Sequence, residues 1–222
     1  CGQYVGETDY CYNTACRNVI TAARHLQRPD GLVLHAWTTE PEKATWADKQ
    51  TGLSPEVWSE GMGWYTLVVP ELLAVLPETH PDYNKILDIY IKMCRGLKSV
   101  QDKSTGGWFM VVDKGDNPLN FIDPSGTAMF VYSLRKGINL GLLKQKEYMP
   151  VVTKGYESLR PFIQVNEQGL LDVIGACDGV VIKKNFIEYV TVPKILNAKE
   201  AVAGVLWAAV IMESEKLMIN ND

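Results

Sequence analysis

Apolar residues recur every three or four positions over six long segments of the chain, as they do along the buried face of an amphipathic helix. This periodicity predicts helices over residues 9–26, 61–76, 82–100, 125–140, 147–163 and 199–217. Two of these helices have recognisable starts. Asp123 is placed to cap the fourth helix ahead of Pro124, and Asn197 with Glu200 three residues later resembles a capping box.

A second pattern recurs between the helices, in LQRPDGLVLH (residues 26–35), VQDKSTGGWFMVV (100–112) and IQVNEQGLLDVI (163–174). Each segment leaves a helix with glutamine after an apolar residue, turns through a glycine and enters a short apolar strand. A long loop then leads to the next helix, so the unit repeats about every 60 to 75 residues. A plain helical bundle would not explain this threefold insert.

Helical hairpins repeated at such a spacing form a solenoid or a closed toroid, in which each unit buries the face of its neighbour. We therefore predict an all-α fold with short β-strands in the loops between helices. The long loops should gather at one end of the helices, where a binding site would be assembled from several repeats.

Composition and charge narrow the class of protein. The 222 residues are 46% hydrophobic and 22% charged, which is typical of a globular protein with a sizeable core, and we expect residues 1–222 to form a single domain. A net charge of −4 argues against a nucleic-acid partner, because no basic stripe is present to neutralise phosphates. The longest uncharged apolar run, residues 201–212, is too short to span a bilayer, so no membrane partner is expected.

The cysteines are odd in number and lack any C-x-x-C spacing; they are Cys1, Cys11, Cys16, Cys94 and Cys177. This pattern predicts buried free thiols in a reducing compartment, and neither a zinc site nor a disulfide framework. A cytoplasmic location is favoured, with the periplasm as the alternative.

Residues 35–65 (HAWTTEPEKATWADKQTGLSPEVWSEGMGWY) hold four of the six tryptophans, in a stretch whose glycines and prolines are typical of a loop. An indole ring packs well against the apolar face of a sugar ring, so aromatic residues in a loop-built cleft favour a carbohydrate site. Trp58 and Trp64 are the favoured sugar contacts. His35 is a further candidate, although a lone histidine more often satisfies a local hydrogen bond. Anchoring of loops to the core explains the remaining tryptophans at least as well, namely Trp37, Trp46 and Trp108.

Carboxylates matter because glycoside chemistry uses them for proton transfer. Glu60 lies between two tryptophans, where apolar walls would perturb its pKa, whereas Asp123 is more readily explained as a helix cap. Spacing alone does not select a catalytic pair from these and the other loop acids, which are Asp48, Glu56, Asp178 and Glu188. The chain contains no G-x-S-x-G, H-E-x-x-H, Walker or dinucleotide-binding motif, which leaves glycan chemistry as the main enzymatic option.

Several runs together carry a family resemblance: HAW, WADKQTGLSPEVWSEGMGWY, LLAVLPETHP, QDKSTGGWFMVVD, DPSGTAMFVYSLRKGINLGLL and NAKEAVAGVLWAA. In this order they resemble the unsaturated rhamnogalacturonyl hydrolases of glycoside hydrolase family 105, relatives of the unsaturated glucuronyl hydrolases of family 88. The resemblance covers essentially the whole chain. It implies an (α/α)6 barrel, which agrees with the helical-hairpin repeat.

The resemblance also implies a reaction. Such enzymes act on the Δ4,5-unsaturated uronic acid that pectin lyases leave at the non-reducing end of a fragment. An aspartic acid delivers a proton to C4 and activates a water that adds at C5, and the resulting hemiketal breaks down to release the neighbouring sugar, commonly rhamnose. An oligosaccharide is the implied partner, and neither a metal nor an organic cofactor is implied.

His35 matches the active-site histidine of this family, and Trp58 and Trp64 match its two sugar-facing tryptophans. Glu60 departs from the family pattern W-x-R-x-x-x-W, which carries an arginine at this position. Arginine suits the carboxylate of a uronate, whereas an ionised glutamate would repel it unless the side chain were protonated or faced elsewhere. Substrate preference therefore depends on Glu60.

The catalytic aspartate of the family would fall shortly before Cys1, so the catalytic residue stays unassigned here. The resemblance places about six of the twelve barrel helices in this chain, a toroid incomplete at the N-terminus with exposed apolar edges. We expect a further N-terminal segment, a homo-oligomer, or a chain that is inactive alone. The alternative to a hydrolase is a non-catalytic or degenerate carbohydrate-binding scaffold. A barrel epimerase would rely on several histidines, and only His25, His35 and His80 occur.

Overall fold

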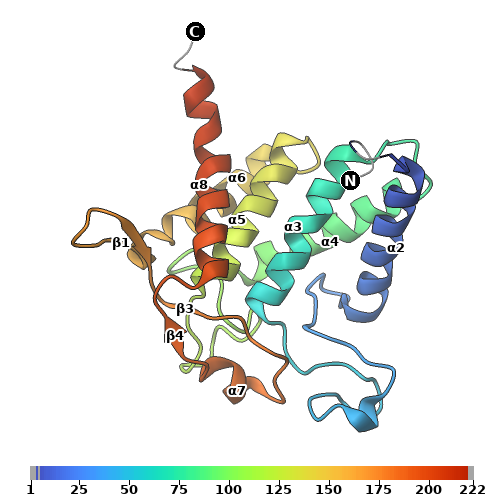
Figure 1. Cartoon of the computed structure of the whole chain (residues 1–222), viewed down its shortest axis with the longest axis horizontal. Coiled ribbons are helices and arrows are strands. Elements are labelled where there is room, and N and C mark those ends of the chain that lie inside the picture. Colours follow the sequence, from blue (N-terminus) through green and yellow to red (C-terminus); the bar gives the residue numbers. More distant parts are fainter. Residues whose placement is uncertain (1–3, 5, 220–222) are drawn as a thin grey trace.

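The fold consists of long helices joined at one end by extended loops (Figure 1). The computed structural model describes residue 4 and residues 6–219, with the backbone alone for residues 214–219. The long helices are α2 (Thr8–Leu26), α3 (Ser59–Val75), α4 (Tyr83–Val100), α5 (Pro124–Asn139), α6 (Gln145–Glu157) and α8 (Lys199–Ile219). Each corresponds to one of the six predicted helices. A short helix, α7 (Phe186–Val190), and two 3₁₀ turns, Pro41–Lys43 and Arg160–Phe162, were not predicted.

The helices form two layers. α5 packs between α3 and α8, and these three helices form a row across the molecule. α4 and α6 lie behind this row (Figure 1), with α4 contacting α2 and α3 and α6 contacting α5. Successive helices therefore alternate between the layers, which confirms the helical-hairpin arrangement.

The turn after α2 fastens that helix to α4. The side-chain amide of Gln27 donates hydrogen bonds to the carbonyl oxygens of Gly31, at 3.4 Å, and Ile89, at 3.0 Å. Gly31 has a φ of 91°, and a Cβ atom there would lie 2.0 Å from the carbonyl oxygen of Lys92. Both the left-handed backbone and the close approach to α4 require glycine.

The turn after α4 repeats this arrangement one helix further on. Gln101 donates to the carbonyl oxygens of Gly106, at 2.7 Å, and Val151 of α6, at 2.9 Å. A Cβ atom on Gly106, whose φ is 84°, would lie 2.7 Å from the carbonyl oxygen of Lys154. The sequence repeat is therefore a structural repeat, in which one glutamine and one glycine join neighbouring helices of the same layer.

The third turn forms a hairpin. β1 (Ile163–Val165) pairs antiparallel with β2 (Leu171–Val173), with Gln164 opposite Asp172. β3 (Ala176–Cys177) pairs in the same way with β4 (Lys194–Ile195). In the first two repeats the predicted strands are reduced to single bridges, such as those of Gln27 with Val33 and Phe109 with Ile122. Short strands in the loops between helices are thus confirmed.

Of the two predicted helix caps, one is confirmed and one is wrong. The Asp123 carboxylate accepts hydrogen bonds from the backbone N–H groups of Ser125 and Gly126, as a helix N-cap does. Asn197 instead has a φ of 55°, accepts a hydrogen bond from the N–H of Val173 and donates one to Asp172. Its side chain therefore bonds to β2 and is not part of a capping box.

The main core lies between the two layers, around large buried side chains such as Tyr90, Trp108 and Phe130. Cys16, Cys94 and Cys177 are buried free thiols and Cys11 is half-buried and free, as expected, while Cys1 lies outside the described residues. Within the described part of the chain, each helix is too short or too polar to cross a bilayer.

Candidate functional site

α3 and α5 begin next to each other at the loop end. The hydroxyl of Ser59, at the start of α3, lies 2.5 Å from a carboxylate oxygen of Asp123, the cap of α5. The helices can approach this closely because Gly126 has no side chain: a Cβ atom there would lie 2.6 Å from that of Ser59. Glu60, in the first turn of α3, is thereby brought beside the start of α5.

Hydrogen-bond donors and acceptors around Ser125 indicate where the protons lie. Its hydroxyl oxygen is 3.1 Å from Glu60 Oε2 and 2.8 and 2.9 Å from the two carboxylate oxygens of Asp123. A serine hydroxyl has one hydrogen to donate. When Ser125 donates it to the capping carboxylate of Asp123, the contact with Glu60 is favourable only if Glu60 is protonated and donates to Ser125.

The electrostatic surroundings of Glu60 agree with this assignment. Burial raises the pKa of Glu60 to about 8, and the carboxylates of Asp123 and Glu200 act in the same direction. The hydrogen bonds that Ser125 and Trp64 would donate to the ionised form lower the pKa, and they offset only part of this effect. Glu60 is therefore a neutral acid at neutral pH.

His35 lies in the same region, behind the start of α3. Its Nδ1 atom is 2.7 Å from the hydroxyl oxygen of Tyr189, and its ring packs against Trp58 with 4.5 Å between ring centres. Because the Tyr189 oxygen also accepts the N–H of Lys183, its own hydrogen is free to be donated to Nδ1. Burial lowers the pKa of His35 to about 4, so the imidazole is neutral and carries its hydrogen on Nε2.

Trp58 is only 5% exposed, in a cluster with Met110, Cys177, Val180 and Tyr189. Its indole Nε1 is buried and has no hydrogen-bond partner among the described residues. Leaving such a donor unpaired costs about 1–3 kcal/mol. A polar partner supplied by a ligand would therefore find a donor waiting at this position.

Trp64 is the exposed member of the predicted group, at 41%. It lies one turn beyond Glu60 on α3 and meets Trp207 of α8 edge-on, with 6.0 Å between ring centres. Trp207 in turn contacts Tyr132 of α5. An aromatic row thus crosses α3, α5 and α8, and Trp64 presents its surface to solvent beside the acid cluster.

The structure assigns structural roles to two of the other tryptophans. Trp108 is fully buried and its indole N–H donates to the carbonyl oxygen of Leu97. Trp37 stacks on His25, with 3.6 Å between ring centres, and its N–H donates to the carbonyl oxygen of Thr51. Anchoring to the core or to a neighbouring loop is therefore confirmed for both, while Trp46 is half-buried.

The remaining loop acids have local partners. Asp48 accepts the N–H groups of Gln50 and Thr51 in an exposed turn. Glu56 pairs with Lys114 at 2.7 Å, and Glu188 accepts the N–H of Lys184 near the start of α7. Asp178 lies 3.9 Å from Lys199 in an exposed pair. Of the predicted acids, the structure joins only Glu60 and Asp123 into one cluster.

Similarity to known proteins identifies the family of this chain. The family model of Glycosyl Hydrolase Family 88 matches residues 1–216. The chain belongs to this family. A family 105 glycoside hydrolase from C. acetobutylicum ATCC 824 superposes with a TM-score of 0.89 at 27% identity, over 96% of this chain and 61% of that one. The family 88 chain therefore has the fold of the (α/α)6 toroid enzymes, as the sequence predicted.

Two further relatives of the family 88 chain were found by sequence. An unsaturated 3S-rhamnoglycuronyl hydrolase of Alteromonas sp. (strain LOR) is 32% identical over 108 residues, which are 47% of this chain and 25% of that protein. A 24.9 kDa protein in the picA locus of Rhizobium radiobacter is 27% identical over 151 residues, 65% of this chain and 63% of that protein. The chain thus spans less than two thirds of the relatives it matches.

Three residues of the candidate site were not predicted from the sequence. Ser125 joins Glu60 to Asp123, Tyr189 bonds His35, and Trp207 packs against Trp64. Each is far along the chain from its partner, so no local pattern connects them. The one available signal was the position of Ser125 two residues after a predicted cap, at the loop end of a helix.

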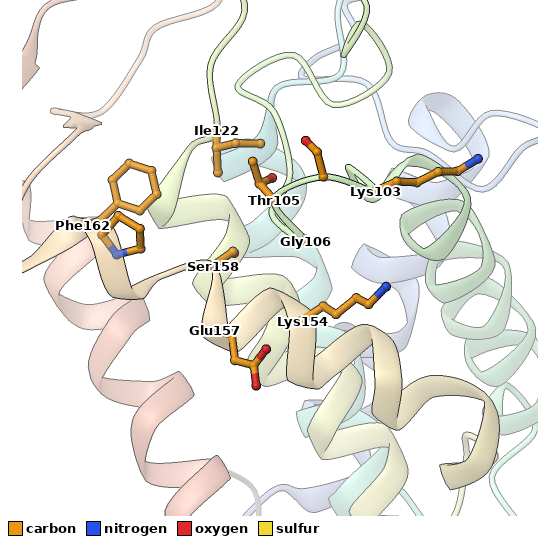
Figure 2. A pocket seen from close by; sticks show the side chains of 10 residues that line it. Lys103, Thr105, Gly106, Ile122, Lys154, Glu157, Ser158 and Phe162 are labelled. Carbon is orange, nitrogen blue, oxygen red and sulfur yellow. The ribbon is translucent and has the colours of Figure 1, made fainter.

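A separate cavity of about 450 Å³ lies between the turn after α4 and the end of α6. Figure 2 shows Lys103, Thr105 and Gly106 on one side and Lys154, Ser158 and Phe162 on the other. Ile122 lies next to Thr105. The cavity contains none of the predicted site residues. The cavity is thus distinct from the cluster around Glu60.

Proposed function

We propose that this family 88 chain serves the hydrolysis of unsaturated uronic-acid oligosaccharides derived from pectin or rhamnogalacturonan, by hydration of the 4,5 double bond. The proposal rests on the exposed indole of Trp64 beside the buried cluster of Glu60, Ser125 and Asp123. It is supported by the likeness to an unsaturated 3S-rhamnoglycuronyl hydrolase.

In this proposal Trp64 packs against the sugar ring and polar neighbours bind its hydroxyls. His35 offers an Nε2–H donor, held in that tautomer by Tyr189. Glu60, being neutral, does not repel the uronate carboxylate and takes part as a hydrogen-bonding acid. The arginine found in the family pattern would instead have formed an ion pair, so this chain would favour substrates in which the carboxylate is bound elsewhere.

A second candidate is a non-catalytic carbohydrate-binding scaffold. It is favoured by the glutamate at position 60, where the family pattern carries an arginine. We assign no proton donor to C4 among the described residues. The two candidates therefore share the same binding residues and differ in whether the double bond is consumed.

Incubation with an unsaturated rhamnogalacturonan disaccharide separates the candidates, because the conjugated double bond absorbs in the ultraviolet and is lost on hydration. Loss of absorbance, with release of the neighbouring sugar, is the expected result for the hydrolase. Binding by calorimetry with constant absorbance would assign the chain to the scaffold. If the chain neither binds the disaccharide nor reduces its absorbance, the proposed function is wrong.

Trp64→Ala should weaken binding of the disaccharide about tenfold or more, because an exposed indole contributes a large apolar contact area and little to the core. Its effect on the free energy of unfolding should stay within about 1 kcal/mol. Calorimetric titration and urea unfolding measure the two quantities. Trp108→Phe, at a fully buried tryptophan, is the matched control and should show the reverse: a loss of stability with affinity retained. A large loss of stability in Trp64→Ala would instead return this residue to the core.

A further inference from the structure

Three side chains with metal-binding atoms meet at the far end of the helices from the candidate sugar site. Cys16 comes from α2, and His80 and Asp82 come from the connection between α3 and α4. One ligand atom from each residue lies within 4.8 Å of the other two. Cys16 is fully buried, while His80 and Asp82 are half-buried and give the group access to solvent.

The connection that carries His80 and Asp82 is held in place by its own bonds. The N–H of His80 donates to the carbonyl oxygen of Pro77, and the N–H of Tyr83 donates to that of His80, at 2.9 and 3.0 Å. Tyr12 of α2 meets the His80 ring edge-on and donates its hydroxyl to the carbonyl oxygen of Val75. The ligand-bearing turn is therefore already docked against the helix that carries Cys16.

The donor set is one thiol, one imidazole and one carboxylate. A tetrahedral Zn²⁺ ion binds these three groups at about 2.0–2.3 Å, which places the ligand atoms about 3.3–3.6 Å apart. To reach this separation from the present one, each ligand atom has to move by about 1 Å or less, and two of the three side chains are half-buried and therefore partly free to move. Three protein ligands leave the fourth position to water.

Metal binding breaks one hydrogen bond in the group and removes one proton from it. The Nδ1 atom of His80 accepts the N–H of Asp82 at 3.1 Å, and this bond is lost whichever ring nitrogen binds the metal. If Nδ1 binds, its lone pair is used; if Nε2 binds, the neutral ring carries its hydrogen on Nδ1. The cost is about 1 kcal/mol. The thiol of Cys16 gives its proton to solvent and binds as the thiolate, so each ion bound releases one proton.

We propose that Cys16, His80 and Asp82 form a binding site for a divalent transition-metal ion, with Zn²⁺ as the fitting ion, that fastens α2 to the connection between α3 and α4. The cysteine spacing in the sequence predicted no zinc site. That spacing could not indicate the present group, because its ligands come from segments far apart in the chain and only one of them is a cysteine. The site lies at the opposite end of α3 from Glu60, so it would stabilise the helices without entering the sugar chemistry (Figure 1).

Cobalt titration of the 222-residue chain tests the proposal, because Co²⁺ adopts the same tetrahedral sites and a thiolate ligand adds a charge-transfer band in the near ultraviolet. The wild-type chain should bind one Co²⁺ with this band, and Zn²⁺ should displace it. Affinity should rise as the pH is raised, since the thiol must lose its proton.

The variants identify the ligands. Cys16→Ser should abolish the band, and His80→Gln and Asp82→Asn should each weaken Co²⁺ binding about tenfold or more. Cys11→Ser is the matched control, because Cys11 lies on the same helix outside the group, and it should bind as the wild type does. If Cys16→Ser fails to fold, the two half-buried variants still decide the question. No band in the wild type, or a band unaffected by both His80→Gln and Asp82→Asn, would overturn the proposal.

Discussion

Replacing Asp123 by alanine should lower the free energy of unfolding by about 3 kcal/mol or more. The carboxylate is buried and accepts hydrogen bonds from Ser59, from the hydroxyl and N–H of Ser125 and from the N–H of Gly126. Alanine removes the cap of α5 and leaves these donors without an acceptor in a buried place. Urea unfolding followed by circular dichroism measures the loss.

Two variants show that the loss comes from the buried bonds. Asp48→Ala removes a carboxylate that accepts similar bonds in an exposed turn, where water replaces it, and should cost about 1 kcal/mol or less. Asp123→Asn keeps one oxygen acceptor for the cap and should fall between the two. A cost below about 1 kcal/mol for Asp123→Ala would contradict the hydrogen-bond assignment around Ser125.

The helices could be predicted from the sequence because the pattern that specifies them is local. α2 and α4, for example, bury one face each, and the periodic apolar residues of that face can be identified in the sequence itself. The cap at Asp123 is equally local, since donor and acceptor are two or three residues apart. The glutamine and glycine turns were visible for the same reason, although their partners in α4 and α6 were not.

One helix boundary differs from the prediction by two residues. α3 begins at Ser59, whereas the prediction began it at Gly61. The structure uses both glycines for close packing: a Cβ atom on Gly61 would lie 2.8 Å from the Trp58 ring, and one on Gly63 would lie 2.6 Å from the sulfur of Met129. Both glycines are therefore helical residues beside large side chains.

The candidate site depends on both a local stretch of sequence and distant parts of the chain. Residues 35–65 contain all four predicted binding residues, and the structure places three of them, Trp58, Glu60 and Trp64, around the first turn of α3. Their chemical state depends on partners elsewhere in the chain. Tyr189 is 154 residues from His35, and Ser125 is 65 residues from Glu60. The protonation of Glu60 could be named as a possibility from the sequence, but its causes, burial and the nearby carboxylate of Asp123, come from the folded structure.

Glu60→Gln should remove a fall in stability that the wild-type chain shows as the pH is raised. The pKa of Glu60 is about 8 in the folded protein against 4.5 for the ordinary group, chiefly because of burial. Between these values the unfolded chain has lost a proton that the folded chain keeps, so raising the pH favours unfolding. The full effect, reached above pH 8, is on the order of 5 kcal/mol.

His35 acts in the opposite direction at lower pH. Burial lowers its pKa to about 4 from 6.5, so below 6.5 the unfolded chain takes up a proton that the folded chain does not. His35 therefore makes stability rise between pH 4 and 6.5, which opposes the fall caused by Glu60. From pH 6.5 to 8 the contribution of Glu60 outweighs the fading one of His35, and that interval is the one to measure.

In that interval the wild-type free energy of unfolding should fall by about 1–2 kcal/mol, while that of Glu60→Gln stays level. Glutamine has nearly the shape of the protonated acid and its amide can donate to Ser125 as the acid does, so the variant changes only the proton. Glu42→Gln, on an exposed 3₁₀ turn, should keep the wild-type profile and serves as the control. A Glu60→Gln profile that still falls between pH 6.5 and 8 would place the titrating group elsewhere. The neutral glutamate proposed for the sugar site would then have to be reconsidered, because a charged Glu60 would repel a uronate at neutral pH.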